Sequence, residues 1–243
     1  MSSPPPLPSE PHPPDRARQP RRGFVSPDVR TRLAAGFAGA ALVVALLSAG
    51  SSLLQVELLE RALVEEISAE EADANDRRER LFGFLGLVGI AEMVFFFAWT
   101  YRVYKNLRPL RASQVRFTPG GSVGWYFCPI LNLWKPLQAM DDIWHGSVGA
   151  RNSLRSPNAL LVGFWWVTWL ASTFIGQASM RLALRSVRTE PTVEELIRST
   201  WVAFASEAAS VLTLALTIVI VLRVGAGQIR RHREMVAADD APG

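Results

Sequence analysis

Apolar residues in this chain gather into four long windows that carry almost no charge. The windows cover residues 33–54, 81–101, 159–178 and 202–222. Each is close to the roughly 20 residues that a helix needs to cross about 30 Å of hydrocarbon. None contains Lys or Arg, and their only acidic residues are Glu92 and Glu207. Soluble amphipathic helices carry charge on one face, so this partition predicts an all-α membrane protein, a bundle of four transmembrane helices.

The remaining sequence divides the chain into a tail, a membrane domain and a second tail. Residues 1–26 are rich in Pro, Ser and charge and cannot bury enough apolar surface to fold, so we expect a disordered Pro-rich tail. Such a tail could dock an SH3-like partner, although a solvated extension is the simpler interpretation. We expect residues 27–236 to form the membrane domain and residues 237–243 to be disordered. The first apolar window is too long for a cleavable signal peptide and is expected to stay as an anchor.

Short cap motifs predict where the helices begin. A hydroxyl residue followed by proline suits the cap and first position of a helix, because proline lacks an N–H that would be unpaired there. A capping box pairs a cap side chain with an acidic residue three positions later. The motifs are Ser26-Pro27, Thr118-Pro119, Ser156-Pro157, Asp76-x-x-Glu79 and Thr192-x-x-Glu195. After the first span, Val56, Leu59, Leu63 and Ile67 recur at helical spacing, which predicts that the first helix projects beyond the membrane.

The distribution of charge predicts the orientation in the cell membrane. The segments before span one, between spans two and three, and after span four carry 6, 8 and 4 Lys or Arg residues. Residues 55–80 and 179–201 carry 4 each, with 9 and 3 acidic residues. The positive-inside rule therefore places both termini in the cytoplasm, although Arg77, Arg78 and Arg80 beside span two oppose this orientation. The basic residues do not form one aromatic-interleaved face, so we expect no nucleic-acid partner.

Small residues in the first two spans predict close helix packing. Gly83, Gly86 and Gly89 lie in span two, and Gly36, Gly39 and Ala40 lie in span one. Small side chains let helix backbones approach closely in lipid. We expect these residues to pack within the four-helix bundle, with self-association as the alternative.

The segment between spans two and three carries the most distinctive motifs. It opens with Trp99-x-x-Arg102-x-x-x-Asn106, whose three residues share one helical face. The second motif runs from Gly124-Trp125 through Pro129, Asn132 and Pro136, and an amphipathic helix then leads to Trp144 and Ser147. Residues 124–134 are apolar but too few to span, which suits an amphipathic or re-entrant element.

Prolines in this segment predict broken helices. Pro129 and Pro136 would interrupt any helix there. We therefore expect residues 117–150 to form a helical hairpin on the cytoplasmic side, either re-entrant or lying on the surface. Trp125, Trp134 and Trp144 would anchor it at the depth of the lipid headgroups.

These motifs resemble a family of bacterial integral membrane proteins known only as a domain of unknown function. Its members have four predicted spans, a Pro-rich N-terminal tail, W-x-x-R-x-x-x-N after the second span, then G-W-x-x-x-P-x-x-N-x-x-x-P and a Trp-x-x-Ser ending, here Trp144 to Ser147. The resemblance covers roughly residues 30 to 225. It implies the fold and the membrane location, and it supplies no activity.

The two intramembrane glutamates are the sharpest functional candidates. A carboxylate in hydrocarbon is costly unless it is protonated, hydrogen-bonded or facing water. Glu92 falls near the midplane and Glu207 about 8 Å below the outer surface, at about 1.5 Å per residue. An outward-opening cavity would solvate both, and the alternative is that each is hydrogen-bonded to a neighbouring helix. Polar residues at similar depth are Ser48, Ser51, Ser52, Ser172, Thr173, Gln177, Ser206 and Ser210.

Arg102 and Asn106 allow two interpretations. They would bind a lipid phosphate, or they would pair with Asp141 or Asp142 to hold the hairpin. The structural role is the simpler one, because basic residues at the interface commonly anchor spans.

Known catalytic and metal motifs are missing from the sequence. It has no Gly-x-Ser-x-Gly elbow, Walker loop or His-Glu-x-x-His motif, and its single cysteine, Cys128, has no partner. His12, His145 and His232 are far apart, so we predict no metal, no cofactor and no catalytic residue. The first interpretation is a non-catalytic scaffold or accessory subunit with a membrane-protein partner or a second copy. The alternatives are a small proton- or cation-coupled transporter or channel and, third, a lipid-acting enzyme.

Overall fold

The computed structural model describes residues 23–113, 115–149, 157–186, 188 and 191–240. All regular structure in these residues is helical, and four helical segments are long and apolar enough to cross a membrane. They are α1 (Asp28–Arg61), α2 with α3 (Ala69–Leu85 and Leu87–Asn106), α6 (Pro157–Ser186) and α7 (Val193–Asp240). The predicted all-α membrane bundle is therefore confirmed.

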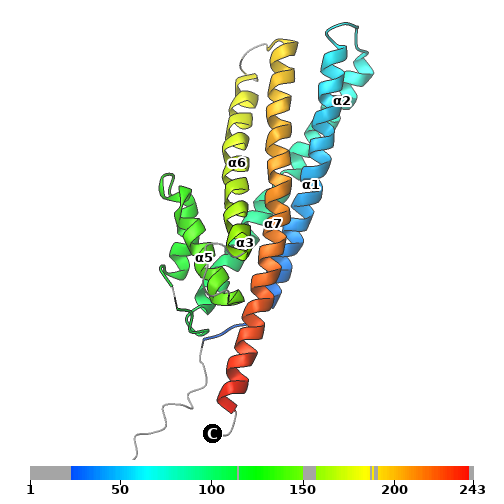
Figure 1. Cartoon of the computed structure of the whole chain (residues 1–243). Coiled ribbons are helices and arrows are strands. Elements are labelled where there is room, and N and C mark those ends of the chain that lie inside the picture. Colours follow the sequence, from blue (N-terminus) through cyan, green and yellow to red (C-terminus); the bar gives the residue numbers. More distant parts are fainter. Residues whose placement is uncertain (1–22, 114, 150–156, 187, 189–190, 241–243) are drawn as a thin grey trace, which may run out of the picture.

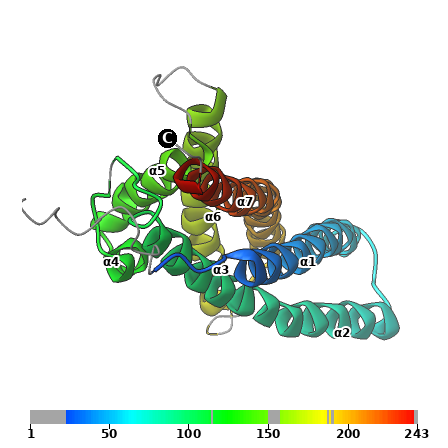
Figure 2. The same cartoon turned by 90° about the horizontal axis from the view of Figure 1, so that it is seen from below.

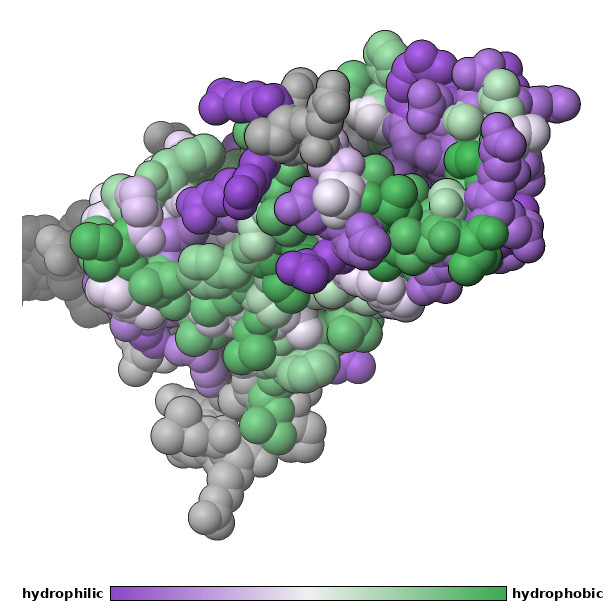
Figure 3. All heavy atoms as spheres, turned by 90° about the horizontal axis from the view of Figure 1, so that it is seen from above, coloured by the Kyte–Doolittle hydropathy of each residue, from purple (hydrophilic) through white to green (hydrophobic). Residues whose placement is uncertain are grey.

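The long helices form a bundle with two distinct ends. α7 lies between α1 and α6, and α3 packs against α1 (Figure 1 and Figure 2). The C-terminal end of α7 and the segment between α3 and α6 lie at one end, which we call the hairpin end (Figure 1). The α1–α2 and α6–α7 connections lie at the other, the loop end. Hydrophilic residues cover the tip formed by α1 and α2 at the loop end, and apolar side chains lie beside them (Figure 3).

The cap motifs place most helix starts correctly. Thr118 accepts a hydrogen bond from the Gly121 N–H at 3.0 Å, and Thr192 and Glu195 form the predicted reciprocal box at 3.2 and 3.3 Å. α1 begins at Asp28, one residue later than Ser26-Pro27 predicts, with the Ser26 hydroxyl 3.3 Å from the Asp28 N–H. Ser156 lies outside the described residues.

The predicted capping box at Asp76 is wrong. The helix begins at Ala69, where Ser68 and Glu71 form the box instead, so residues 69–80 extend the second span beyond the membrane. α1 ends at Arg61, and Leu63 and Ile67 lie beyond it. Both helices project from the membrane at the loop end because their charged outer turns are satisfied by water rather than by lipid.

The chain ends are more ordered than their composition predicts. Val25 lies in the predicted disordered tail, yet the Asn106 amide donates to its carbonyl at 2.9 Å. α7 continues to Asp240, which includes residues 237–240 of the predicted C-terminal tail. Residues 1–22 and 241–243 lie outside the described residues.

The glycines predicted to pack the bundle do not do so. A Cβ atom added at Gly36, Gly39, Gly83 or Gly89 would meet no heavy atom within 4 Å. Close backbone contacts occur instead at the hairpin end, where a Cβ at Gly227 of α7 would lie 2.7 Å from the Ser147 carbonyl oxygen. The four helices splay toward the loop end, so small residues are needed where the helices converge.

The segment between α3 and α6 forms a broken hairpin. Its helical pieces are α4 (Pro119–Gly124), η2 (Trp125–Phe127), η3 (Leu131–Leu133) and α5 (Lys135–Val148). The Trp166 indole of α6 donates to the Leu133 carbonyl at 3.1 Å, so the tip of the hairpin reaches the depth of span three (Figure 1). Apolar side chains at the tip are exposed, namely Phe127, Ile130, Leu133 and Trp134.

An aromatic core joins the hairpin to the bundle. Trp99, Trp144 and Trp165 are each at most 1% exposed. Trp144 was expected to anchor the hairpin in the lipid headgroups, but its side chain is buried, because α5 turns it inward against the long helices. Trp134, at 40% exposed, stays at the surface of the hairpin.

Candidate functional site

A cavity of about 310 Å³ lies among α1, α6, α7 and the α2–α3 junction. Glu92 of α3 and Glu207 of α7 both line it, although 115 positions separate them in the sequence. The helical hydrogen bonding breaks at Gly86, between α2 and α3, and Gly86 and Gly89 form part of the wall. The other lining residues are Ala41, Val44, Ala45, Ser48, Leu85, Trp169, Ser172, Ser210, Thr213 and Leu214.

Glu207 is connected to the loop end by a chain of polar groups. The Ser52 hydroxyl of α1 donates to the Glu207 carboxylate at 2.9 Å. The neighbouring Ser51 hydroxyl lies 3.3 Å from Glu79 and accepts from the Arg78 guanidinium at 2.9 Å. Polar contacts therefore lead from the charged turns of α2 toward the cavity.

Glu92 lies deeper and makes no hydrogen bond or ion pair with any residue that the structure describes. Tyr126 of the hairpin packs against Phe96 and Phe97, about one helical turn beyond Glu92 in α3. Tyr126 is 8% exposed, and its hydroxyl has no hydrogen-bond partner among the described residues. The interpretation of Glu92 as a hydrogen-bonded packing residue therefore lacks a partner.

Aromatic rings close the cavity toward the hairpin end. The Trp169 ring, which lines the cavity, stacks on Trp166 with centroids 4.7 Å apart. Tyr126 meets Trp169 edge-on at 5.6 Å and Phe97 at 5.0 Å. Trp169 therefore lines the cavity with Tyr126 of the hairpin packed behind it, and we call these two rings the floor of the cavity.

The predicted polar candidates divide between the cavity and its surroundings. Ser48, Ser172 and Ser210 line the cavity, and Ser52 contacts it through Glu207. Gln177 is exposed on α6 and is not part of the lining, because the helix turns it to another face. Trp169, Gly89 and Tyr126 were not predicted. Only the tertiary structure brings the hairpin tyrosine against Trp169 and against Phe96 of α3.

The Trp99-to-Asn106 motif forms a polar clasp at the hairpin end. The Trp99 indole donates to the Thr31 hydroxyl of α1 at 3.2 Å. The Asn106 amide donates to the Gln228 side chain of α7 at 3.0 Å, and the Gln228 amide donates in turn to the Ser147 hydroxyl of α5 at 3.1 Å. We use the term clasp for Asn106, Gln228 and Ser147. It joins α3, α5 and α7.

The expected pairing of Arg102 and Asn106 with the two aspartates is wrong. Asn106 binds Gln228 and Val25 instead, because it faces α7 and the start of α1. Arg102 forms no ion pair with either aspartate among the described residues, and its buried Nε atom has no hydrogen-bond partner there. Both aspartates pair with Arg116, at 2.7 Å for Asp141 and 3.0 Å for Asp142.

The other motif residues shape the hairpin. Pro136 is buried at the first turn of α5, and Trp125 meets the Phe117 ring edge-on at 6.0 Å. The Asn132 N–H donates to the Cys128 carbonyl at 2.7 Å, across Pro129. Gly124 ends α4. These residues set the turns and do not converge on a ligand.

Asp142 is a buried anchor of the hairpin. Its carboxylate accepts from the Tyr104 hydroxyl at 2.8 Å and from the Arg116 N–H at 3.0 Å. Burial raises the pKa of Asp142 above its ordinary value, although the bonds from Arg116 and Tyr104 oppose this shift. The neighbouring Asp141 side chain is 36% exposed and contacts His145 and Arg116 at the surface.

We expect Asp142→Ala to lower the free energy of unfolding by about 3 kcal/mol, because it removes the acceptor of the buried Tyr104 hydroxyl and of the Arg116 N–H. Asp141→Ala is the matched control. It should cost less than about 1 kcal/mol, since exposed ion pairs contribute little. Thermal unfolding of the two variants in detergent measures the difference, and equal losses would contradict the role given to Asp142.

Comparison with known proteins agrees with the resemblance noted from the motifs. A family model described as Domain of unknown function (DUF4328) matches residues 64–226. No curated protein and no solved structure matches the chain. The match covers the cavity residues of α3, α6 and α7, the hairpin and most of the clasp. With more than half of its length matched, and with four membrane-spanning helices, the chain belongs to the DUF4328 family of domains of unknown function.

Proposed function

We propose that this protein binds a cation in its intramembrane cavity and passes it across the cell membrane, with the hairpin end and both termini in the cytoplasm. The observation that carries the proposal is that Glu92 and Glu207 line one cavity. Carboxylates inside a membrane protein are costly, and they commonly mark pathways for ions or protons. The positive-inside pattern of the sequence supports the orientation.

The polar contacts supply a route from the loop end. The chain from Arg78 through Ser51 and Ser52 leads to Glu207, and Glu92 lies beyond it next to the aromatic floor. A cation entering from the loop end would lose bound water and bind first to Glu207 and then to Glu92. Release at the hairpin end requires the floor formed by Tyr126 and Trp169 to move.

The scaffold interpretation, which the sequence placed first, gives no reason for an unpaired Glu92 facing a cavity. Every buried acidic group requires a partner, a proton or a ligand. A transport function uses Glu92 as a ligand for the cation, whereas the scaffold requires this residue to be protonated, and we therefore propose transport first. A lipid-acting enzyme stays third.

Flux through liposomes tests the proposal. Purified protein is reconstituted, a membrane potential is imposed, and entry of H⁺, Na⁺ and K⁺ is followed with ion-sensitive dyes. We expect Glu92→Gln and Glu207→Gln to reduce the flux at least tenfold, because glutamine keeps the size and hydrogen bonding of glutamate without its charge. Gly89→Leu should block the flux by filling the cavity, since a side chain there meets no neighbouring atom at its base.

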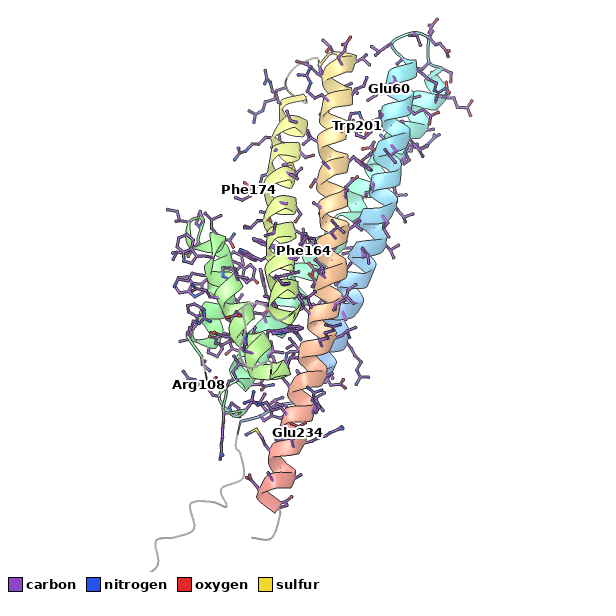
Figure 4. All side chains as sticks on the ribbon, in the orientation of Figure 1. Glu60, Arg108, Phe164, Phe174, Trp201 and Glu234 are labelled. Carbon is purple, nitrogen blue, oxygen red and sulfur yellow. The ribbon has the colours of Figure 1, made fainter. Side chains whose placement is uncertain are left out.

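Glu60→Gln is the control for the loss of a carboxylate. Glu60 is exposed near the loop end of α1, away from the cavity, whereas Glu234 marks the opposite end of the molecule (Figure 4). It should leave the flux unchanged. Wild-type flux in both cavity variants, or no flux from the wild-type protein above protein-free liposomes, would overturn the proposal and return the scaffold to first place.

A further inference from the structure

The hydroxyl groups of the cavity are arranged as hydrogen-bond acceptors. The Ser172 hydroxyl donates to the Trp169 carbonyl, and the Ser210 hydroxyl to the Ser206 carbonyl, both at 2.9 Å within their own helices. Thr213 donates in the same way to Ala209 at 2.9 Å. A hydroxyl that has given its only hydrogen to the backbone can only accept from a ligand. Together with Glu92 and Glu207, these groups prefer a ligand that donates hydrogen bonds.

The remaining wall is apolar and aromatic. Val44, Leu85 and Leu214 contribute aliphatic surface, and Trp169 contributes an indole ring backed by Trp166. Aliphatic surface favours a hydrocarbon group, while the face of an indole attracts a cation. The polar part of the wall therefore suits the charged end of an amphiphilic cation, and the apolar part suits its hydrocarbon chain.

The size and composition of the cavity fit an organic ligand better than a bare metal ion. Divalent metal ions in proteins require about six or more oxygen ligands at short distance. The described residues contain no group of three or more His, Cys, Asp or Glu side chains that could hold a metal ion. The volume of about 310 Å³ is also many times the roughly 30 Å³ of one water molecule. It falls at the lower end of the range for pockets that hold small organic molecules.

Tyr126 supplies an independent sign of a ligand. Its ring contacts Trp169 of the wall at 5.6 Å, and its buried hydroxyl has no hydrogen-bond partner in the described structure. A buried hydroxyl without a partner is uncommon, because leaving it unpaired costs free energy. A ligand group that reaches past the Trp169 ring would supply the missing partner.

We propose that the cavity binds an organic ammonium ion with N–H donors and a short apolar chain, held by Glu92 and Glu207 at its charged end and by Trp169 and the aliphatic wall along its chain. The proposal rests on the proposed function, because it names the class of cation that uses the same site. The ammonium N–H groups donate to the carboxylates and to the acceptor hydroxyls.

Calorimetric titration of the protein in lipid nanodiscs tests the ligand class. The probes are n-butylammonium, n-butyltrimethylammonium, n-butanol and sodium chloride. We expect n-butylammonium to bind and its affinity to fall at least tenfold in Glu92→Gln and in Gly89→Leu, with Glu60→Gln unchanged. The trimethyl analogue keeps the charge and the chain but has no N–H donor, so it should bind at least tenfold more weakly, and n-butanol should not compete. A normal size-exclusion profile of each variant shows that it is folded.

Two outcomes separate this inference from the proposed function. Glu92-dependent flux of H⁺ or Na⁺ without n-butylammonium binding would overturn the ligand class and leave cation passage standing. Binding of n-butylammonium that depends on Glu92, without flux of any cation tested, would support the ligand class and overturn transport. Equal affinity for n-butylammonium and its trimethyl analogue would overturn the requirement for N–H donors.

Discussion

Gly227→Ala is expected to destabilise the protein, although alanine is the better helix former. A Cβ atom at this position would lie 2.7 Å from the Ser147 carbonyl oxygen and 3.1 Å from its carbon. These are backbone atoms of α5, which cannot move aside as the end of a flexible side chain can. Overpacking of this kind costs about 1–3 kcal/mol, more than the gain of about 1 kcal/mol in helix propensity.

Gly163→Ala provides the matched control. Gly163 lies in the first third of α6, where an added Cβ would meet no heavy atom within 4 Å. We expect this substitution to leave the melting temperature in detergent unchanged or to raise it, whereas Gly227→Ala lowers it. A melting temperature for Gly227→Ala at or above that of the wild type would show that α5 and α7 do not approach as closely as the structure has them.

Gln228→Leu is expected to open the clasp. Gln228 is fully buried, and its amide donates to the Val103 carbonyl at 2.8 Å and to the Ser147 hydroxyl at 3.1 Å while its carbonyl accepts from Asn106. Leucine has a similar size but leaves the buried Asn106 amide and Ser147 hydroxyl short of partners. Each unsatisfied group costs about 1–3 kcal/mol, so we expect a loss of about 2–4 kcal/mol in the free energy of unfolding.

A double-mutant cycle with Asn106→Leu identifies the source of this loss. If the two side chains act as one unit, removing both costs less than the sum of the single losses, by about 0.5–3 kcal/mol. Gln177→Leu is the control, because Gln177 is exposed on α6, and it should cause no loss. Additive losses at positions 106 and 228 would show that the amide-to-amide bond contributes little.

Both predictions concern the hairpin end, where the helices converge. Gly227 and Gln228 are consecutive residues of α7, and both contact Ser147. Gly227 lets the Ser147 backbone approach closely, and the Gln228 amide donates a hydrogen bond to the Ser147 hydroxyl. The loop end has open glycines and a cavity instead. We infer that a tightly joined end holds the hairpin in place while the open end admits the ligand.

Much of the site could be predicted from the sequence because hydrocarbon excludes charge. Glu92 and Glu207 stand out among apolar residues, and helical rise gives their depths. Depth does not tell which face of a helix a residue occupies relative to its neighbours, so Gln177 was grouped with the cavity although it is exposed. The sequence did not indicate that Tyr126 belongs near the site, because a tyrosine in an apolar loop is common.

The motif residues also show a difference between what the sequence predicts and what only the tertiary structure decides. Asn106 and Ser147 were recognised as part of a pattern, but their partner Gln228 lies 122 positions beyond Asn106 and belongs to no motif. The sequence analysis predicted an aspartate as the partner of Asn106, because both aspartates lie closer to it in the chain than Gln228 does. The structure replaces it with a contact between two uncharged amides, and the aspartates pair with Arg116.

By itself the sequence determined the membrane location, the four spans, the broken hairpin and the depth of both glutamates. These properties follow from the transfer of each segment between water and lipid, which depends on local composition and length. Only the tertiary structure decided that the two carboxylates share a cavity, that Tyr126 of the hairpin packs behind its wall and that Asn106 joins Gln228. Those contacts depend on how helices distant in sequence rotate and pack against one another, which is set by the fit of their side chains.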